Sequence, residues 1–211
     1  EGGFAPKINS NEKALRLLVQ ALEHAGLRLG RDVALGIDAA STEFYDSEHE
    51  IYRLKADRKH FKPASIARLY ARWAKRYHLE VIEDGCSEDD LLGWQKLTAQ
   101  LGDEVVLVGD DLFVTDPFRL QAGIIAGVAN SILIKPNQIG SLSETLQTIQ
   151  IAQKYGYKVI ISHRSGETSD DFIADLAVAV GADYIKAGSL ARGERIAKYN
   201  RLLKIAEELK L

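Results

Sequence analysis

The feature that most constrains the fold of this chain is a regular alternation of short apolar runs with longer amphipathic stretches. The amphipathic stretches carry apolar residues at a helical spacing, and the turns between them are short. This order predicts parallel strands joined by right-handed helical crossovers. The six strand-like runs are 33–37, 79–82, 105–109, 131–134, 158–162 and 183–185.

The helices can be placed from their apolar spacing and their end signals. Ser87-x-x-Asp90 resembles a capping box ahead of the helix at 91–101, and Gly102 is a suitable stop. Region 43–61 is polar and aromatic, and we expect it to be an irregular excursion on the rim of the fold. The predicted helices are 10–26, one that starts at Pro63, 91–101, 117–128, 141–155, 170–180 and 193–211.

Two architectures accommodate such strands. An open doubly wound sheet brings only two or three strand ends near one ligand, whereas a barrel of TIM type brings all of them to one mouth. Every run here ends on an ionisable residue, which favours the barrel. We therefore predict an α/β fold, a parallel (β/α) barrel with six of the eight units, and treat 1–211 as one incomplete barrel domain. The residues at the run ends are Asp38, Glu83, Asp110, Lys135, His163 and Lys186.

Composition excludes several classes of protein. The net charge is −3 and the sequence pI is about 6.0, so we expect no nucleic-acid partner. No apolar stretch approaches the roughly 20 residues of a spanning helix, so we expect no membrane span. The single Cys86 fits a reducing cytosol, and we expect a cytoplasmic protein. Because the sequence contains no Met, we expect it to be a segment of a longer protein, called here the parent protein.

Three acids at consecutive run ends predict a metal site. Asp38, Glu83 and Asp110 are hard oxygen ligands with no Cys or His among them, which selects Mg²⁺ over Zn²⁺. Each acid alone is more often a helix cap or a surface charge. Their shared position at successive strand ends favours the metal site.

The remaining run ends predict a binding site for an anion. Lys135 ends a buried strand, where desolvation favours the neutral amine of a general base, although a snorkelling Lys is the plainer alternative. The motif at 163–167 offers the planar fork of Arg164 and the hydroxyl of Ser165 to a phosphate, although a solvated loop is an alternative. Lys186 could hold a second anionic group. These residues describe a site for a phosphorylated carboxylate whose enediolate is stabilised by metal.

The motifs carry a resemblance to a known family. The chain resembles the C-terminal part of enolase (phosphopyruvate hydratase) from its first residue to about Glu208. The matching segments are 1–6, 38–45, 82–85, 108–115, 135–145, 162–168, 172–178 and 185–200.

This resemblance implies an activity and a set of roles. It implies a Mg²⁺-dependent lyase of glycolysis that interconverts 2-phosphoglycerate and phosphoenolpyruvate, in a parent protein that is a homodimer or a higher oligomer. Lys135 would accept the C2 proton, and Glu1 would donate a proton to the departing hydroxyl. The implied ligands are Asp38, Glu83 and Asp110 for Mg²⁺, Arg164 and Ser165 with His163 for the phosphate, and Lys186 for the carboxylate.

The chain departs little from the family pattern at the site residues, but it lacks a large part of the family's length. Ala39, Pro136, Ala187 and Gly193 replace usual residues, but none of them removes a charge. The family's N-terminal domain and first barrel strands have no counterpart here, so we expect the isolated chain to be inactive. Two alternatives are another enolase-superfamily acid-sugar dehydratase and a non-catalytic barrel fragment that acts as a binding module.

Overall fold

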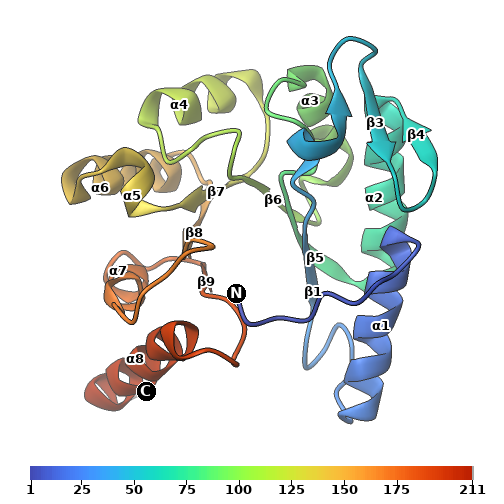
Figure 1. The fold of residues 1–211 in the computed structure, drawn as a ribbon. Helices are drawn as coiled ribbons and strands as arrows, with labels where there is room; N and C mark the ends of the chain where they lie inside the picture. The colour runs from blue at the N-terminus through green and yellow to red at the C-terminus, as the bar shows by residue number, and fades with distance from the viewer. Residues whose placement is uncertain (211) are drawn as a thin grey trace. The chain divides into compact units, whose positions relative to one another are not determined.

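The computed structural model describes residues 1–210, so the last residue of the predicted helix 193–211 lies outside the described residues. The chain divides into two compact units, each with its own parallel strands and covering helices (Figure 1). Unit 1 consists of Glu1–Pro6, Val114–Leu120 and Ser131–Leu211, and unit 2 of Lys7–Phe113 and Gln121–Asn130.

Unit 2 contains three parallel strands in the order β1-β5-β6. Ile82, Leu107 and Val108 are fully buried on these strands, as expected for parallel strands covered by helices. Helix α2 contacts α1, α3 and β5. The bounds are β1 Leu35–Asp38, β5 Leu79–Glu83, β6 Val106–Gly109, α1 Asn11–His24, α2 Pro63–Tyr77 and α3 Leu91–Leu101.

Region 43–61 is the predicted excursion, inserted between β1 and α2, but it is built of regular elements and is not irregular. A short 3-10 helix, η1 (Ser41–Phe44), leads into an antiparallel sheet of β2 (Tyr45–Asp46), β3 (Ile51–Leu54) and β4 (Lys59–Phe61). Both β3 and β4 contact α2, beside which they lie in Figure 1. Tyr52 explains the order, because its fully buried ring packs on Phe44 and its hydroxyl donates to Asp90 at 2.6 Å.

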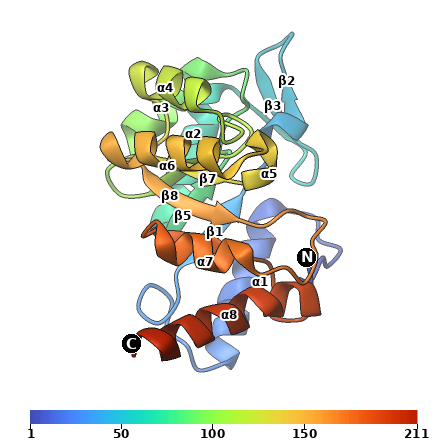
Figure 2. The ribbon, with the colours of Figure 1, turned by 90° about the vertical axis from the view of Figure 1, so that its left-hand side faces the viewer.

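Unit 1 contains three parallel strands in the order β7-β8-β9. Helices α7 and α8 pack against each other and run side by side in Figure 2. The bounds are β7 Ser131–Ile134, β8 Lys158–Ser162, β9 Tyr184–Lys186, α5 Pro136–Ile139, α6 Leu142–Lys154, α7 Phe172–Ala179 and α8 Gly193–Leu209. Helix α4 (Pro117–Ala126) starts in the unit 1 segment and ends in the unit 2 segment.

Side-chain hydrogen bonds cap α6 and α3, and the cap of α3 is not the residue that the sequence predicted. Ser141 caps α6, because its hydroxyl accepts the backbone N–H of Glu144. The cap of α3 is Asp90, whose carboxylate accepts the N–H of Gly93 at 2.8 Å. The prediction of Ser87 as the cap was wrong, because its hydroxyl instead accepts the N–H of Asp89 within the preceding turn.

All six apolar runs form strands, so the predicted alternation is confirmed, with small differences at the ends. Within 1–210, no helix combines the length and the hydrophobicity that a membrane crossing requires.

Candidate active site

The three predicted metal ligands lie at the C-terminal ends of neighbouring strands in unit 2. Asp38 on β1 is the register partner of Glu83 on β5. Glu83 is in turn the register partner of Val108, two residues before Asp110. Glu83 and Asp110 are buried, whereas Asp38 is exposed.

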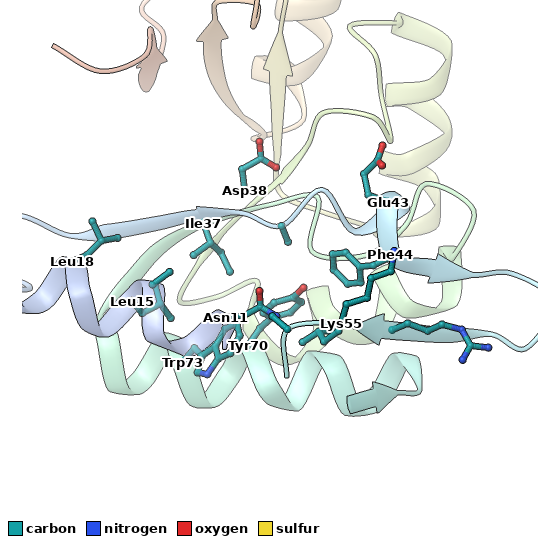
Figure 3. Close-up of a pocket in the computed structure, with 15 residues that line it drawn as sticks. Asn11, Leu15, Leu18, Ile37, Asp38, Glu43, Phe44, Lys55, Tyr70 and Trp73 are labelled. Atoms are coloured by element: carbon teal, nitrogen blue, oxygen red, sulfur yellow. The ribbon is translucent and has the colours of Figure 1, made fainter. Parts of the chain in front are cut away.

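Asp38 points away from the helices that cover β1. Figure 3 shows Ile37 directed toward α1 and α2, and Asp38 directed to the other side of the strand. A cavity of about 470 Å³ lies in this region, and its lining is mostly apolar. The cavity therefore does not define the acidic site, although Asp38 contributes to its lining.

A tighter acidic cluster in unit 2 shares one residue with the predicted set. Carboxylate oxygens of Asp84, Asp110 and Asp111 lie within 4.8 Å of one another. Asp84 accepts the backbone N–H groups of Asp110 and Asp111, both at 2.9 Å, and so fixes the turn after β6. The sequence analysis missed Asp84, although its position directly after Glu83 was a usable signal.

The electrostatics of this cluster suit a cation. Burial raises the pKa of Asp84 to about 7; the two backbone N–H groups oppose this rise, and the neighbouring Asp110 and Asp111 add to it. A divalent cation nearby would favour the ionised carboxylate. Because every donor in this cluster is a carboxylate oxygen, the residues fit a hard divalent cation.

In unit 1, Thr115 holds the backbone of Lys135. Lys135 is half-buried and follows β7 directly, and its N–H donates to the hydroxyl of Thr115 at 2.9 Å. That hydroxyl donates to Gln138 at 2.8 Å, and the Thr115 carbonyl accepts from Thr148 at 2.9 Å. Thr115 is fully buried at φ +59°, so its backbone is held in a left-handed conformation by these contacts.

The predicted anion-binding residues of unit 1 gather at the ends of β8 and β9. Ser162 is the register partner of Lys186, and the N–H of His163 donates to the Lys186 carbonyl at 2.9 Å. His163 is buried, whereas the side chains of Arg164 and Ser165 are exposed. The structure therefore places the motif at 163–167 beside Lys186.

Glu1 joins this group from the other end of the sequence. The hydroxyl of Ser165 donates to Glu1 Oε1 at 3.0 Å, and that oxygen lies 3.9 Å from His163 Nε2. Burial raises the pKa of Glu1, but the Ser165 hydrogen bond, the nearby His163 and the positive charges of Lys186 and the N-terminal ammonium outweigh it. The resulting pKa lies below the ordinary value of 4.5, so Glu1 is ionised at neutral pH in this state.

The chain matches a known family over almost its whole length. Residues 1–210 match the family described as "Enolase, C-terminal TIM barrel domain". The chain is also 53% identical over 210 residues to the enolase of Helicobacter pylori (strain J99). The chain belongs to the enolase family.

The match shows the fold class and how much of the relative's length this chain covers. It covers 100% of this chain and 49% of the Helicobacter enolase, so the chain spans about half the length of that relative. The predicted α/β class, an incomplete parallel barrel of TIM type in the C-terminal domain of enolase, is thus confirmed.

Replacing Thr115 with Val should loosen the end of β7. Thr115→Val keeps the shape but removes the acceptor of the Lys135 N–H, so the free energy of unfolding should fall by about 1–3 kcal/mol. Amide exchange at Lys135 should accelerate. Thr145→Val is the matched control, because Thr145 is equally buried but its hydroxyl bonds only within the first turn of α6. Equal effects of the two changes on Lys135 exchange would contradict the role of Thr115.

Replacing Asp84 with Asn should loosen the turn after β6. An amide can accept one backbone N–H but presents its own N–H₂ to the other, so the free energy of unfolding should fall by about 1–3 kcal/mol. We expect Mg²⁺ to raise the melting temperature, and this shift should be smaller in the variant. Asp89→Asn, at an exposed position of the same segment, is the control for the loss of charge. An unchanged Mg²⁺ shift in Asp84→Asn would show that the turn does not support cation binding.

Proposed function

We propose that this chain carries the catalytic residues of an enolase, a Mg²⁺-dependent carbon–oxygen lyase that reversibly dehydrates 2-phosphoglycerate to phosphoenolpyruvate. The observation that carries the proposal is the hydrogen bond between Ser165 and Glu1, which are 164 residues apart in the sequence. It joins the candidate acid to the candidate phosphate loop. The similarity to a named enolase supports the same reaction.

The acids of unit 2 would hold the cation. Asp38, Glu83 and Asp110 are the proposed ligands, and Asp84 holds the turn that carries Asp110. When bound, Mg²⁺ supplies positive charge that opposes the negative charge gathering on the substrate carboxylate.

Lys135 and Glu1 would move the two protons. The neutral amine of Lys135 takes the proton from C2 of the substrate. The carboxyl of Glu1 gives a proton to the 3-hydroxyl, so that the C3–O bond breaks and water leaves. Glu1 must first be protonated, and an anionic substrate beside it would raise its pKa from the lowered value of the ligand-free site.

The loop after β8 would bind the phosphate. Arg164 is exposed, and one of its Nη atoms donates to Asn137 Oδ1 at 3.0 Å, which orients the guanidinium. Ser165 and His163 add donors, and Lys186 would bind the carboxylate of the substrate. A phosphate-binding loop favours enolase itself over an acid-sugar dehydratase, whose substrates carry no phosphate.

The proposal assigns the reaction to the parent protein, not to the chain alone. The Helicobacter enolase is about twice as long, and the remainder of its length has no counterpart here. We propose that the parent protein forms a homodimer or a higher oligomer and works in the cytoplasm.

Removing the base should abolish turnover while sparing substrate binding. In the parent protein, Lys135→Ala should lower kcat by at least about 10²–10⁴-fold, because a proton-transfer group is lost. Formation of phosphoenolpyruvate, followed by its ultraviolet absorbance, measures the effect. Lys154→Ala, an exposed lysine of α6, is the control and should leave kcat unchanged. Turnover that survives in Lys135→Ala would remove Lys135 from the mechanism.

The isolated chain should not catalyse the reaction. Assayed beside the parent protein at equal concentration with 2-phosphoglycerate and Mg²⁺, the 211-residue chain should show negligible turnover. The physical reason is positioning, since displacement of a catalytic group by about 1 Å can cost about 10²-fold in rate. Turnover close to that of the parent protein would overturn this part of the proposal and make the chain a complete catalyst.

A further inference from the structure

Helix α8 carries two buried cations that face the loop after β8. The exposed fractions are 1% for Arg195 and 0% for Lys198. Burying a charged side chain is costly unless it is paired and hydrogen-bonded. The partners of these two side chains therefore show what their burial achieves.

Arg195 binds three consecutive residues of the loop. One guanidinium nitrogen, Nη1, donates to His163 Nδ1 and to the carbonyl of Arg164 at 2.8 Å. The other, Nη2, donates to the carbonyl of Ser165 at 2.6 Å. The planar fork of an arginine can reach several acceptors at once in a fixed geometry, which a lysine ammonium cannot match.

Lys198 extends this support along the loop. Its ammonium donates to Glu167 Oε2 at 2.7 Å and to the carbonyl of Thr168 at 2.6 Å. It also donates to the carbonyl of Glu194 in its own helix at 2.7 Å. Together, the two cations fix both ends of the loop and leave its Arg164 and Ser165 side chains exposed.

The contact of Arg195 with His163 determines where the imidazole proton lies. A guanidinium has no acceptor, so Nδ1 of His163 must accept and cannot carry a proton. The neutral ring therefore carries its proton on Nε2, the atom that lies 3.9 Å from Glu1 Oε1. His163 is then an N–H donor on the side where Glu1 and Ser165 meet.

Gly188 leaves the room that Arg195 needs. A Cβ at Gly188, which has φ +88°, would lie 2.7 Å from Cδ of Arg195 and 3.1 Å from the Glu1 carbonyl oxygen. A side chain at this position would displace either the arginine stem or the segment that carries Glu1. The absence of a side chain at Gly188 therefore leaves space for the aliphatic part of Arg195.

We propose that Arg195 is a positioning residue, which holds His163 as the neutral Nε2–H tautomer and fixes the Arg164 and Ser165 carbonyls so that the loop presents its side chains to a phosphate. The inference rests on the proposed function for the role of the loop. The arrangement of Arg195, His163 and the carbonyls does not depend on the reaction.

The titration of His163 provides a readout that a merely structural arginine would not move. Burial is the largest cause that lowers the pKa of His163, and the charges of Arg195 and Lys186 lower it further. Glu1 and Glu167 raise it, but the net pKa lies below the ordinary value of 6.5. Removing Arg195 should therefore raise this pKa. The neutral ring contributes stability that is present above the unfolded value of about 6.5 and is lost as the pH falls from there to the folded pKa, so the loss should be smaller in the variant.

The first experiment needs no variant of Arg195. Nitrogen NMR of the parent protein labelled with [¹⁵N]histidine, with the His163 signal assigned from His163→Asn, should show a neutral ring protonated on Nε2 at pH 7.5. A ring protonated on Nδ1, or a doubly protonated ring, would overturn the proposal. This measurement stands even if an Arg195 variant fails to fold.

The second experiment compares two arginines of the same helix. Arg195→Met should raise the pKa of His163 and weaken the binding of inorganic phosphate to the parent protein at least about tenfold. Arg195→Lys should recover the pKa only in part, because it restores the charge without the fork. Arg201→Met is the control, since Arg201 bonds to Asp175 and Glu208. If Arg195→Met leaves both the pKa and the phosphate affinity as in Arg201→Met, the proposal is wrong.

Kinetics then separate this inference from the proposed reaction. With 2-phosphoglycerate, Arg195→Met should lower kcat/KM by up to about 10²-fold and move the acid limb of its pH profile upward. A kcat/KM and acid limb like those of Arg201→Met would count against the positioning role. If the parent protein does not turn over 2-phosphoglycerate, the proposed function is wrong. The tautomer and pKa of His163 and the phosphate affinity would still decide the role of Arg195.

Discussion

The register of parallel strand pairing is the constraint on which the candidate site depends. Parallel strands that start together also end together, so residues far apart in sequence arrive at one edge. In unit 2 this constraint pairs Asp38 with Glu83. In unit 1 it pairs Lys186 with Ser162, the residue directly before His163. A slip of one residue would turn each of these side chains to the opposite face. The positions of the candidate site residues in each unit therefore depend on the backbone hydrogen bonds between its strands.

Register alone does not orient the turns that follow the strands, and buried polar side chains complete this task. Asp84 accepts two backbone N–H groups of the turn after β6, and Thr115 accepts the N–H that follows β7. Arg195 donates to two carbonyls of the loop after β8. In each case the side chain supplies the partner that an irregular backbone segment cannot find in a strand. Leaving such groups unpaired costs about 1–3 kcal/mol each, so the turns keep one conformation.

The sequence predicts the strands and helices well because their signals are local. Apolar runs and helical spacing both lie within a few residues of the elements that they specify. The order of β2–β4 was missed because it depends on Tyr52 and Asp90, which are 38 residues apart. The ionisable strand ends were visible for the same local reason, whereas Thr115 and Arg195 were not. Their roles are contacts with backbone groups 20 to 31 residues away, for which a single sequence carries no spacing rule.

The dependence of the β8 loop on α8 sets an order of events during synthesis. Arg195 follows His163 by 32 residues, so the loop is synthesised before the arginine that holds it. Glu1 waits far longer, because its bond to Ser165 spans 164 residues. Closing such long loops is slower than forming local structure. A nascent chain would pair β7 with β8 early and organise the candidate anion-binding edge last, so ordering of that edge would report on nearly complete folding of unit 1.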